Sequence, residues 1–156
     1  MLREVLLVSI LTLCSAVVTS SCRHGPTRSA YRSIHQAAID GDSTAVAADL
    51  NANPGNLNLA DDAGQTPLHL GAVHCRTNVV ALLLEKGAKV DAVMKGNATP
   101  LHLAAQAGCS GAVILLLSKG AHINFRDGEG RTPLTRAKQW HQNATAQLLQ
   151  EGGGTE

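Results

Sequence analysis

Apolar residues recur along this chain in short helical faces that return at a constant interval. TPLHLGAVHC begins at Thr66, TPLHLAAQAGC begins at Thr99, and a weaker copy, TPLTRAKQW, begins at Thr132, so that each starts 33 positions after the one before. A second apolar run follows each stretch, and the clearest of these runs are NVVALLLEK (78–86) and AVILLLSK (112–119). An interval of this length predicts a repeated structural unit rather than a single catalytic centre.

The pattern predicts two helices in each unit. The Thr-Pro pair that opens a stretch favours a helix start, because the threonine hydroxyl can cap a free amide and proline needs no donor at the first helical position. The second run has the broad apolar face of another helix. Gly87 or Gly120 follows it and can end it in a left-handed conformation. Turn-forming residues come next, so each unit reads as turn, helix and helix.

These motifs together resemble the ankyrin repeat family, since TPLHLAA, a GA-(K/H)-(V/I)-(D/N) segment and a glycine-containing hairpin recur with a period of 33 residues. The resemblance implies an all-α repeat solenoid with about four repeats, at residues 33–58, 61–91, 94–124 and 127–150. The residues of the structural motif are Thr66, Pro67, His69, Thr99, Pro100, His102, Thr132 and Pro133.

The first and last repeats depart from the motif, as terminal repeats with one side in water usually do. The first begins with SIHQAAIDGD, where Ser33 and Gln36 are a candidate capping box, and one extra residue lies in its NPGN connection. The last has Thr135 in place of the motif histidine. We expect a repeat domain over residues 33–151 and a flexible tail over residues 152–156.

The hairpin of the third repeat lacks the usual glycine. Asn97 stands where the neighbouring hairpins have Gly64 and Gly130. Asparagine tolerates a left-handed conformation, so we expect this turn to be kept.

The N-terminal region predicts export. VLLVSILTLCSAVV (5–18) is shorter than the roughly 18 apolar residues of a membrane-spanning helix, and it favours a signal peptide over residues 1–21, with an uncleaved anchor as the alternative. Cys22 follows small residues and resembles the lipobox cysteine of bacterial lipoproteins, so lipidation and ordinary cleavage both stay open. We expect a protein of the bacterial periplasm or an outer-membrane lipoprotein, alternatively a secreted one, with residues 22–32 as a basic tether.

Composition narrows the class of partner. The formal net charge is +1 and 16% of residues are charged, which gives no basic surface for nucleic acid. The hydrophobic content is 44% with one Trp, one Tyr and one Phe, so the core must be aliphatic. We expect a monomer that needs no cofactor.

Three histidines occupy the same place in successive repeats: His35, His69 and His102. They do not form a metal site, because neighbouring repeats lie roughly 10 Å apart and shared ligation needs distances near 2 Å. The resemblance implies that this histidine instead bonds to neighbouring backbone and to the threonine hydroxyl.

Cys75 and Cys109 fall near each other on one side of the predicted stack. An exported protein can hold a disulfide between them if their Cα atoms lie within about 7 Å. The alternative is a redox or hydrolytic enzyme that uses Cys75 with His74, which requires a low thiol pKa and a partly exposed site. The sequence has no phosphate loop, zinc-spaced cysteine set or separated acid pair, so we expect no enzyme.

The resemblance implies that a partner protein binds to the concave surface formed by the hairpin tips and the exposed edge of the first helices. The positions carried over are Ile39, Asp40, Asp62, Ala63, Gln65, Val73, His74, Lys95, Gly96, Ala98, Gln106, Ala107, Glu129, Arg131, Gln139 and Trp140. A lone Trp there is a candidate hot spot, unless it folds over the C-terminal cap. The implied function is protein binding by a preorganised surface. Its narrower form is a periplasmic inhibitor or immunity protein that masks a toxin or enzyme, and a third possibility is a structural envelope component.

Overall fold

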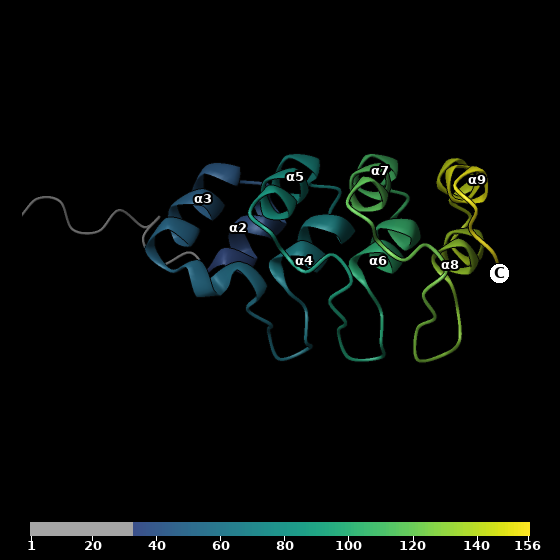
Figure 1. Ribbon diagram of the computed structural model, residues 1–156, viewed down its shortest axis with the longest axis horizontal. Coiled ribbons are helices and arrows are strands. Elements are labelled where there is room, and N and C mark those ends of the chain that lie inside the picture. Colours follow the sequence, from purple (N-terminus) through teal and green to yellow (C-terminus); the bar gives the residue numbers. More distant parts are fainter. Residues whose placement is uncertain (1–32) are drawn as a thin grey trace, which may run out of the picture. The chain divides into compact units, whose positions relative to one another are not determined.

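The computed structural model describes residues 33–156, and it arranges them as a row of helix pairs (Figure 1). The predicted signal peptide, the tether and Cys22 lie outside the described residues. The elements are α2 (Ile34–Asp40), α3 (Ser43–Ala52), the 3-10 helix η2 (Pro54–Asn58), α4 (Pro67–Val73), α5 (Thr77–Glu85), α6 (Pro100–Ala107), α7 (Ser110–Ser118), α8 (Pro133–Gln139) and α9 (Asn143–Glu151). The predicted all-α repeat solenoid is confirmed.

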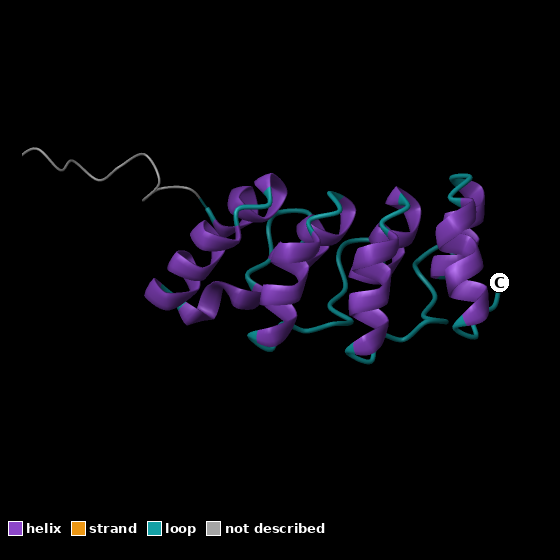
Figure 2. Ribbon diagram, turned by 90° about the horizontal axis from the view of Figure 1, so that it is seen from above, coloured by secondary structure: helices purple, strands orange, loops and turns teal. Residues whose placement is uncertain are grey.

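The helices form two layers. The first helices of the pairs, α2, α4, α6 and α8, pack side by side in an inner layer, and α3, α5, α7 and α9 pack in an outer layer. Figure 1 shows the outer layer along the top, while the loops between pairs project below the inner layer. Figure 2 shows the outer helices running across the long axis of the row. Each pair packs against its neighbours in the row, as in other solenoids.

The Thr-Pro pairs start helices as predicted. Thr66 is the N-cap of α4, and its side chain accepts from the backbone of His69 while the His69 ring accepts from the Thr66 amide. Thr99 makes the same capping box in α6. In α8 the Thr132 hydroxyl accepts from the amide of Thr135, which stands in place of the motif histidine.

The first repeat differs from the others at its start and at its exit. The Ser33 hydroxyl accepts from the Gln36 amide, but the Gln36 side chain donates to Asp40, so only half of the candidate capping box forms. The connection with the extra residue winds into η2. His35 Nε2 therefore lies 2.9 Å from the carbonyl oxygen of Leu59 and does not reach the following hairpin.

A continuous aliphatic core runs along the row, as the composition predicts. Its largest fully buried apolar side chains are Ile34, Leu68, Leu83, Leu101, Leu116, Leu134, Leu149, Val46, Val79 and Val80. Within residues 33–156, every fully buried side-chain nitrogen or oxygen has a hydrogen-bond partner. None of the helices in this range has the length and apolar character needed to cross a membrane.

Residues 152–156, expected to be a flexible tail, instead lie back on the last repeat. Gly153 has a φ of 91°, close to the 86° of Gly120 at the equivalent position one repeat earlier. The Thr155 amide donates to Asn124 Oδ1 at 2.7 Å. The segment thus follows the path of the connection after α7. Its glycine content suggested flexibility, but Gly153 occupies the left-handed position that the repeat requires.

Candidate interaction surface

Two of the inner helices, α4 and α6, are each joined to the next hairpin by a buried histidine. His69 Nδ1 lies 3.2 Å from the Thr66 amide nitrogen, and its Nε2 lies 3.2 Å from the carbonyl oxygen of Ala98. His102 repeats this arrangement with the carbonyl of Arg131. Because Nδ1 accepts from an amide, each ring is neutral and donates through Nε2. The expected contacts to backbone and to the threonine hydroxyl are therefore present at His69 and His102, but not at His35. Within residues 33–156 there is no group of three or more potential metal ligands.

Burial keeps these two rings neutral. Desolvation is the largest influence on the pKa of His69 and of His102, and it lowers both pKa values despite the opposing effect of the backbone carbonyls. The neutral form is the form that the hydrogen bonds require. The histidines therefore belong to the scaffold that holds the surface.

The hairpins turn at equivalent left-handed residues. Gly64 has a φ of 80°, Asn97 of 58° and Gly130 of 76°. Asn97 therefore adopts the left-handed conformation that was expected, and the turn is kept. The three tips project in parallel because the same turn recurs in each repeat.

Adjacent hairpins are also bonded to each other. The Lys95 amide donates to the carbonyl of Ala63 at 3.0 Å, and the Gly128 amide donates to the carbonyl of Gly96 at 2.8 Å. These bonds fix the spacing between tips. The surface that the tips form is therefore preorganised.

Asp127 organises the last hairpin through a network that the sequence analysis missed. Its buried carboxylate accepts from the amides of Glu129 and Arg131, both at 2.9 Å, and from the side chains of Arg131 and Arg136. Arg136 also donates to Gln106 Oε1 at 2.9 Å. Burial raises the pKa of the carboxyl group, but the four donors outweigh it and hold the pKa well below its usual range. The sequence did contain a signal of this network: Arg136 stands at an inner-helix position where two other repeats have Leu70 and Leu103.

The predicted partner-binding residues differ in exposure. Eight are exposed: Asp40, Asp62, His74, Lys95, Gly96, Glu129, Gln139 and Trp140. Seven are half-buried: Ile39, Ala63, Gln65, Val73, Gln106, Ala107 and Arg131. Ala98 is a correction, because only 2% of its surface is exposed and its side chain is not available to a partner. It lies directly before the buried helix start, where its carbonyl accepts from His69.

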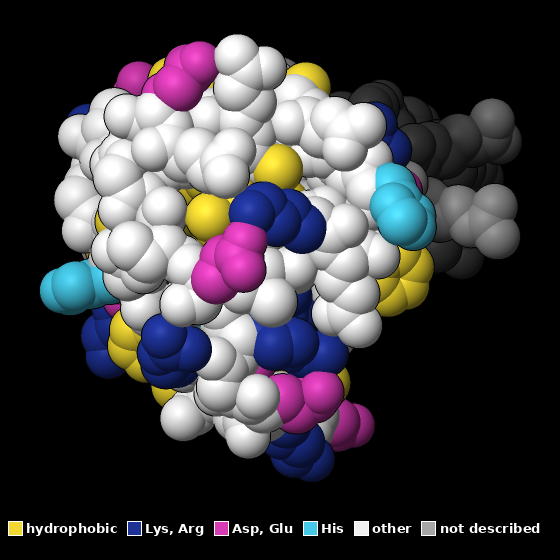
Figure 3. Space-filling model, turned by 90° about the vertical axis from the view of Figure 1, so that its right-hand side faces the viewer, with side chains coloured by type: hydrophobic (Ala, Val, Ile, Leu, Met, Phe, Trp, Pro, Cys, Tyr) yellow, Lys and Arg dark blue, Asp and Glu magenta, His cyan; other side chains and the backbone are white. Residues whose placement is uncertain are grey.

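Trp140 follows α8 and is 55% exposed. Asp40, His74 and Ala107 occupy the same place at or after the ends of the other inner helices. The chain therefore presents four different side chains in a row at this edge. Figure 3 shows the C-terminal end of the array, where basic side chains lie next to acidic ones near the centre and in the lower part.

A disulfide joins Cys75 and Cys109, whose Cα atoms lie 5.1 Å apart. Cys75 is exposed in the turn between α4 and α5, and Cys109 is 4% exposed at the start of α7. In this bonded state neither sulfur is a thiolate, so the Cys75–His74 nucleophile has no reactive form.

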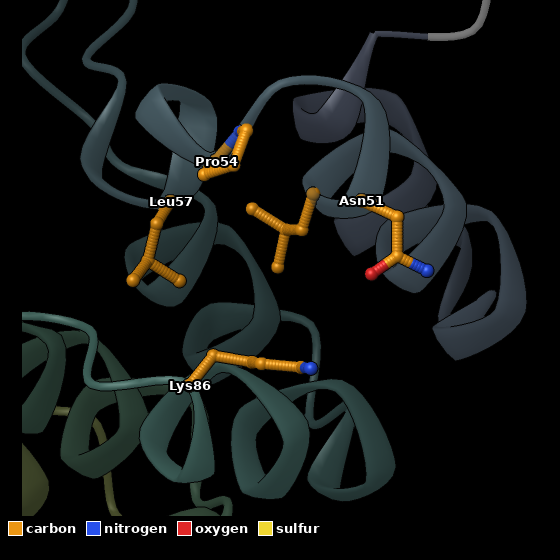
Figure 4. A pocket seen from close by; sticks show the side chains of 5 residues that line it. Asn51, Pro54, Leu57 and Lys86 are labelled. Carbon is orange, nitrogen blue, oxygen red and sulfur yellow. The ribbon is translucent and has the colours of Figure 1, made fainter.

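A cavity near the N-terminal end of the array lies away from the predicted surface. It has a volume of about 310 Å³ and opens between the ends of α3 and α5 beside η2, lined by Leu50, Asn51, Pro54, Leu57 and Lys86 (Figure 4). Its walls are mainly apolar, and Asn51 and Lys86 carry their polar ends to the same side. None of the predicted partner-binding residues lines it.

A family model described as ankyrin repeats in three copies matches residues 34–127 and 95–155 of this chain. The two matches cover the helix pairs and the three hairpins, and the second extends beyond α9 into the segment that lies back on the last repeat.

Proposed function

Because the chain belongs to the ankyrin repeat family, whose members are generally protein–protein interaction modules, we propose that it binds a partner protein outside the cytosol. The binding face, named here the inner surface, consists of the exposed residues at the inner-helix ends and hairpin tips: Asp40, Asp62, His74, Lys95, Gly96, Glu129, Gln139 and Trp140.

The observation that carries this proposal is a division between constant and variable positions. The motif side chains, such as His69 and His102, are buried and hydrogen-bonded, and they maintain the scaffold. The positions at the ends of the inner helices differ from one repeat to the next, and most of them face solvent. A rigid scaffold with variable exposed side chains suits recognition of one specific partner.

The disulfide supports export. Disulfides persist in secreted and periplasmic proteins and are rare in the cytosol, and the bond between Cys75 and Cys109 agrees with the predicted signal peptide. The proposed location is the bacterial envelope, either as an outer-membrane lipoprotein with a lipid on Cys22 or as a periplasmic protein after ordinary cleavage, with secretion as the alternative. Masking of a toxin or an enzyme is the narrower form of the proposed function, since an exposed Trp suits insertion into a partner's pocket.

A comparative capture experiment tests the proposal. The chain from Arg23 onward, with His74→Ala and Trp140→Ala combined, should lose a partner that the unmodified chain retains from envelope extract. Gln106 and Arg131 are left unchanged, because replacing them would disturb the Asp127 network. The matched control is Ile114→Ala, which removes an apolar side chain that is 54% exposed on the outer helix α7.

The control variant should retain the partner. Equal retention by all three forms would refute binding through the inner surface. Retention of no protein by the unmodified chain would favour the structural envelope role instead.

A further inference from the structure

The turn between the two helices of each repeat contains a residue in the left-handed region. Figure 2 shows these turns along one long edge of the row. The left-handed residues and their φ values are Gly41 at 81°, Cys75 at 55°, Gly108 at 75° and His141 at 57°. Glycine is the residue that this conformation favours, so a cysteine at the second turn calls for a physical explanation.

The residue after the left-handed position reaches back over the preceding turn. Arg76 lies over Gly41: its Nε donates to the carbonyl of Ile39 at 2.8 Å, and a Cβ on Gly41 would come within 2.8 Å of Arg76 Cδ. Gln142 covers Gly108 in the same way, since a Cβ there would come within 2.2 Å of Gln142 Oε1. Each of these contacts joins two adjacent repeats.

Cys109 occupies the position of Arg76 and Gln142, and Cys75 occupies the position of the covered glycine. The disulfide is therefore the middle member of three successive contacts between turns. In the outer two, a long side chain lies over a bare glycine. In the middle one, a covalent bond replaces that contact.

We propose that this bond is a redox-dependent latch that orders the central edge of the inner surface. His74 directly precedes Cys75, and Ala107 lies two residues before Cys109, so the latched turns carry the central positions of that edge. This inference rests on the proposed function for its biological meaning. The latch itself requires no partner.

Reduction would open the latch at the exposed side. A dithiol reductant attacks Cys75 Sγ through its thiolate and expels the Cys109 thiolate, which takes up a proton. The second thiol of the reductant then displaces Cys75 from the mixed disulfide, which leaves two protein thiols and one cyclic disulfide. Because Cys109 is buried, its thiolate is a disfavoured leaving group, and the latch resists mild reductants.

The two sulfur atoms must separate to non-bonded contact once the bond is broken. Cys109 is held in the packed start of α7, whereas Cys75 is exposed in a turn that its Cβ disfavours. The displacement therefore falls mainly on the turn at residues 74–77. The turn at Gly108 and Cys109 loses the same link and is loosened as well, whereas the turn at Gly41 contains no such bond and stays in place.

Hydrogen exchange of the full repeat domain tests this inference without a partner. In the reduced protein, the amides of residues 74–78 and 107–111 should exchange at least about tenfold faster than in the oxidised protein. The amides of α2 should change less than about twofold. The control is Cys75→Gly combined with Cys109→Gln, which copies the Gly108–Gln142 contact and should exchange equally with and without reductant.

If the amides of residues 74–78 and 107–111 exchange equally fast in the oxidised and the reduced protein, the proposed latch is wrong. A uniform acceleration along the whole row would also overturn it, since that result describes a general staple with no local effect. Neither outcome bears on the proposed function, because capture by the inner surface is measured separately in the oxidised protein.

Discussion

His69 Nε2 lies 3.2 Å from the carbonyl oxygen of Ala98 while Nδ1 of the same ring lies 3.0 Å from the Thr66 hydroxyl, so one imidazole joins the start of α4 to the next hairpin. Both contacts are buried. The ring thus transmits the position of an inner helix to a hairpin tip that belongs to the following repeat.

Replacement of His69 should therefore cost more than replacement of its counterpart in the first repeat. His69→Ala leaves a buried carbonyl and a buried amide without partners, and we expect the free energy of unfolding to fall by about 3 kcal/mol. His35→Ala removes a half-buried ring whose one contact, to the Leu59 carbonyl, is exposed to solvent, and it should cost about 1 kcal/mol. Urea unfolding measures both values, and equal losses would contradict the structural difference.

Stability should fall as the solution is made mildly acidic. The pKa values of His69 and His102 are lowered in the folded state, so the unfolded chain takes up protons first as the pH falls. The stabilisation is complete above about pH 6.5 and is lost below it as the pH approaches the lowered values, at up to about 1.4 kcal/mol per pH unit for each histidine. Urea unfolding at pH 7.5, 6.0 and 5.0 measures this slope. His102→Gln should roughly halve it, and an unchanged slope would rule out this origin.

Loss of the disulfide should destabilise the array. The bond closes a loop with a sequence separation of 34 residues, for which the chain-entropy estimate is about 4 kcal/mol. Cys75→Ala and Cys75→Gly both remove it, but glycine relieves the left-handed backbone and should leave the protein about 1 kcal/mol more stable than alanine. Denaturant unfolding of the two variants gives the comparison, and identical stabilities would show that the turn does not keep its left-handed conformation.

Substitutions of Asn97 test the left-handed backbone conformation at this hairpin tip. Its φ of 58° suits glycine better than asparagine, so Asn97→Gly should raise the free energy of unfolding by about 0.5 kcal/mol and Asn97→Val should lower it by about 1 to 2 kcal/mol. Thermal unfolding separates the two variants. A valine variant as stable as the parent would mean that the hairpin adopts another turn.

The helix starts were predictable because each depends on residues close together in the sequence, and the histidine contacts were predictable because the resemblance to the ankyrin repeat family implies them. A Thr-Pro pair sets its own N-cap, and a histidine three residues after the threonine returns to the same amide. The recurrence of the motif then places the next hairpin within reach. The helix starts alone need no knowledge of the whole fold.

The Asp127 network was not predictable in this way. It joins Gln106, Asp127 and Arg136, which belong to separate segments and to two repeats. A motif read one repeat at a time treats Arg136 as a solvent-facing charge. Ala98 was placed on the surface for a similar reason, since a hairpin position near the tip is usually exposed whereas this one lies against the buried helix start.

The single tryptophan of this chain gives the inner surface its own optical probe. Trp140 is more than half exposed at the end of α8, so its indole fluorescence responds to the polarity of that edge without any added label. A partner that covers the inner surface would shift the emission to shorter wavelength, whereas a partner on the outer helices would leave the spectrum unchanged. The emission wavelength of Trp140 thus distinguishes binding to the inner surface from binding to the outer helices.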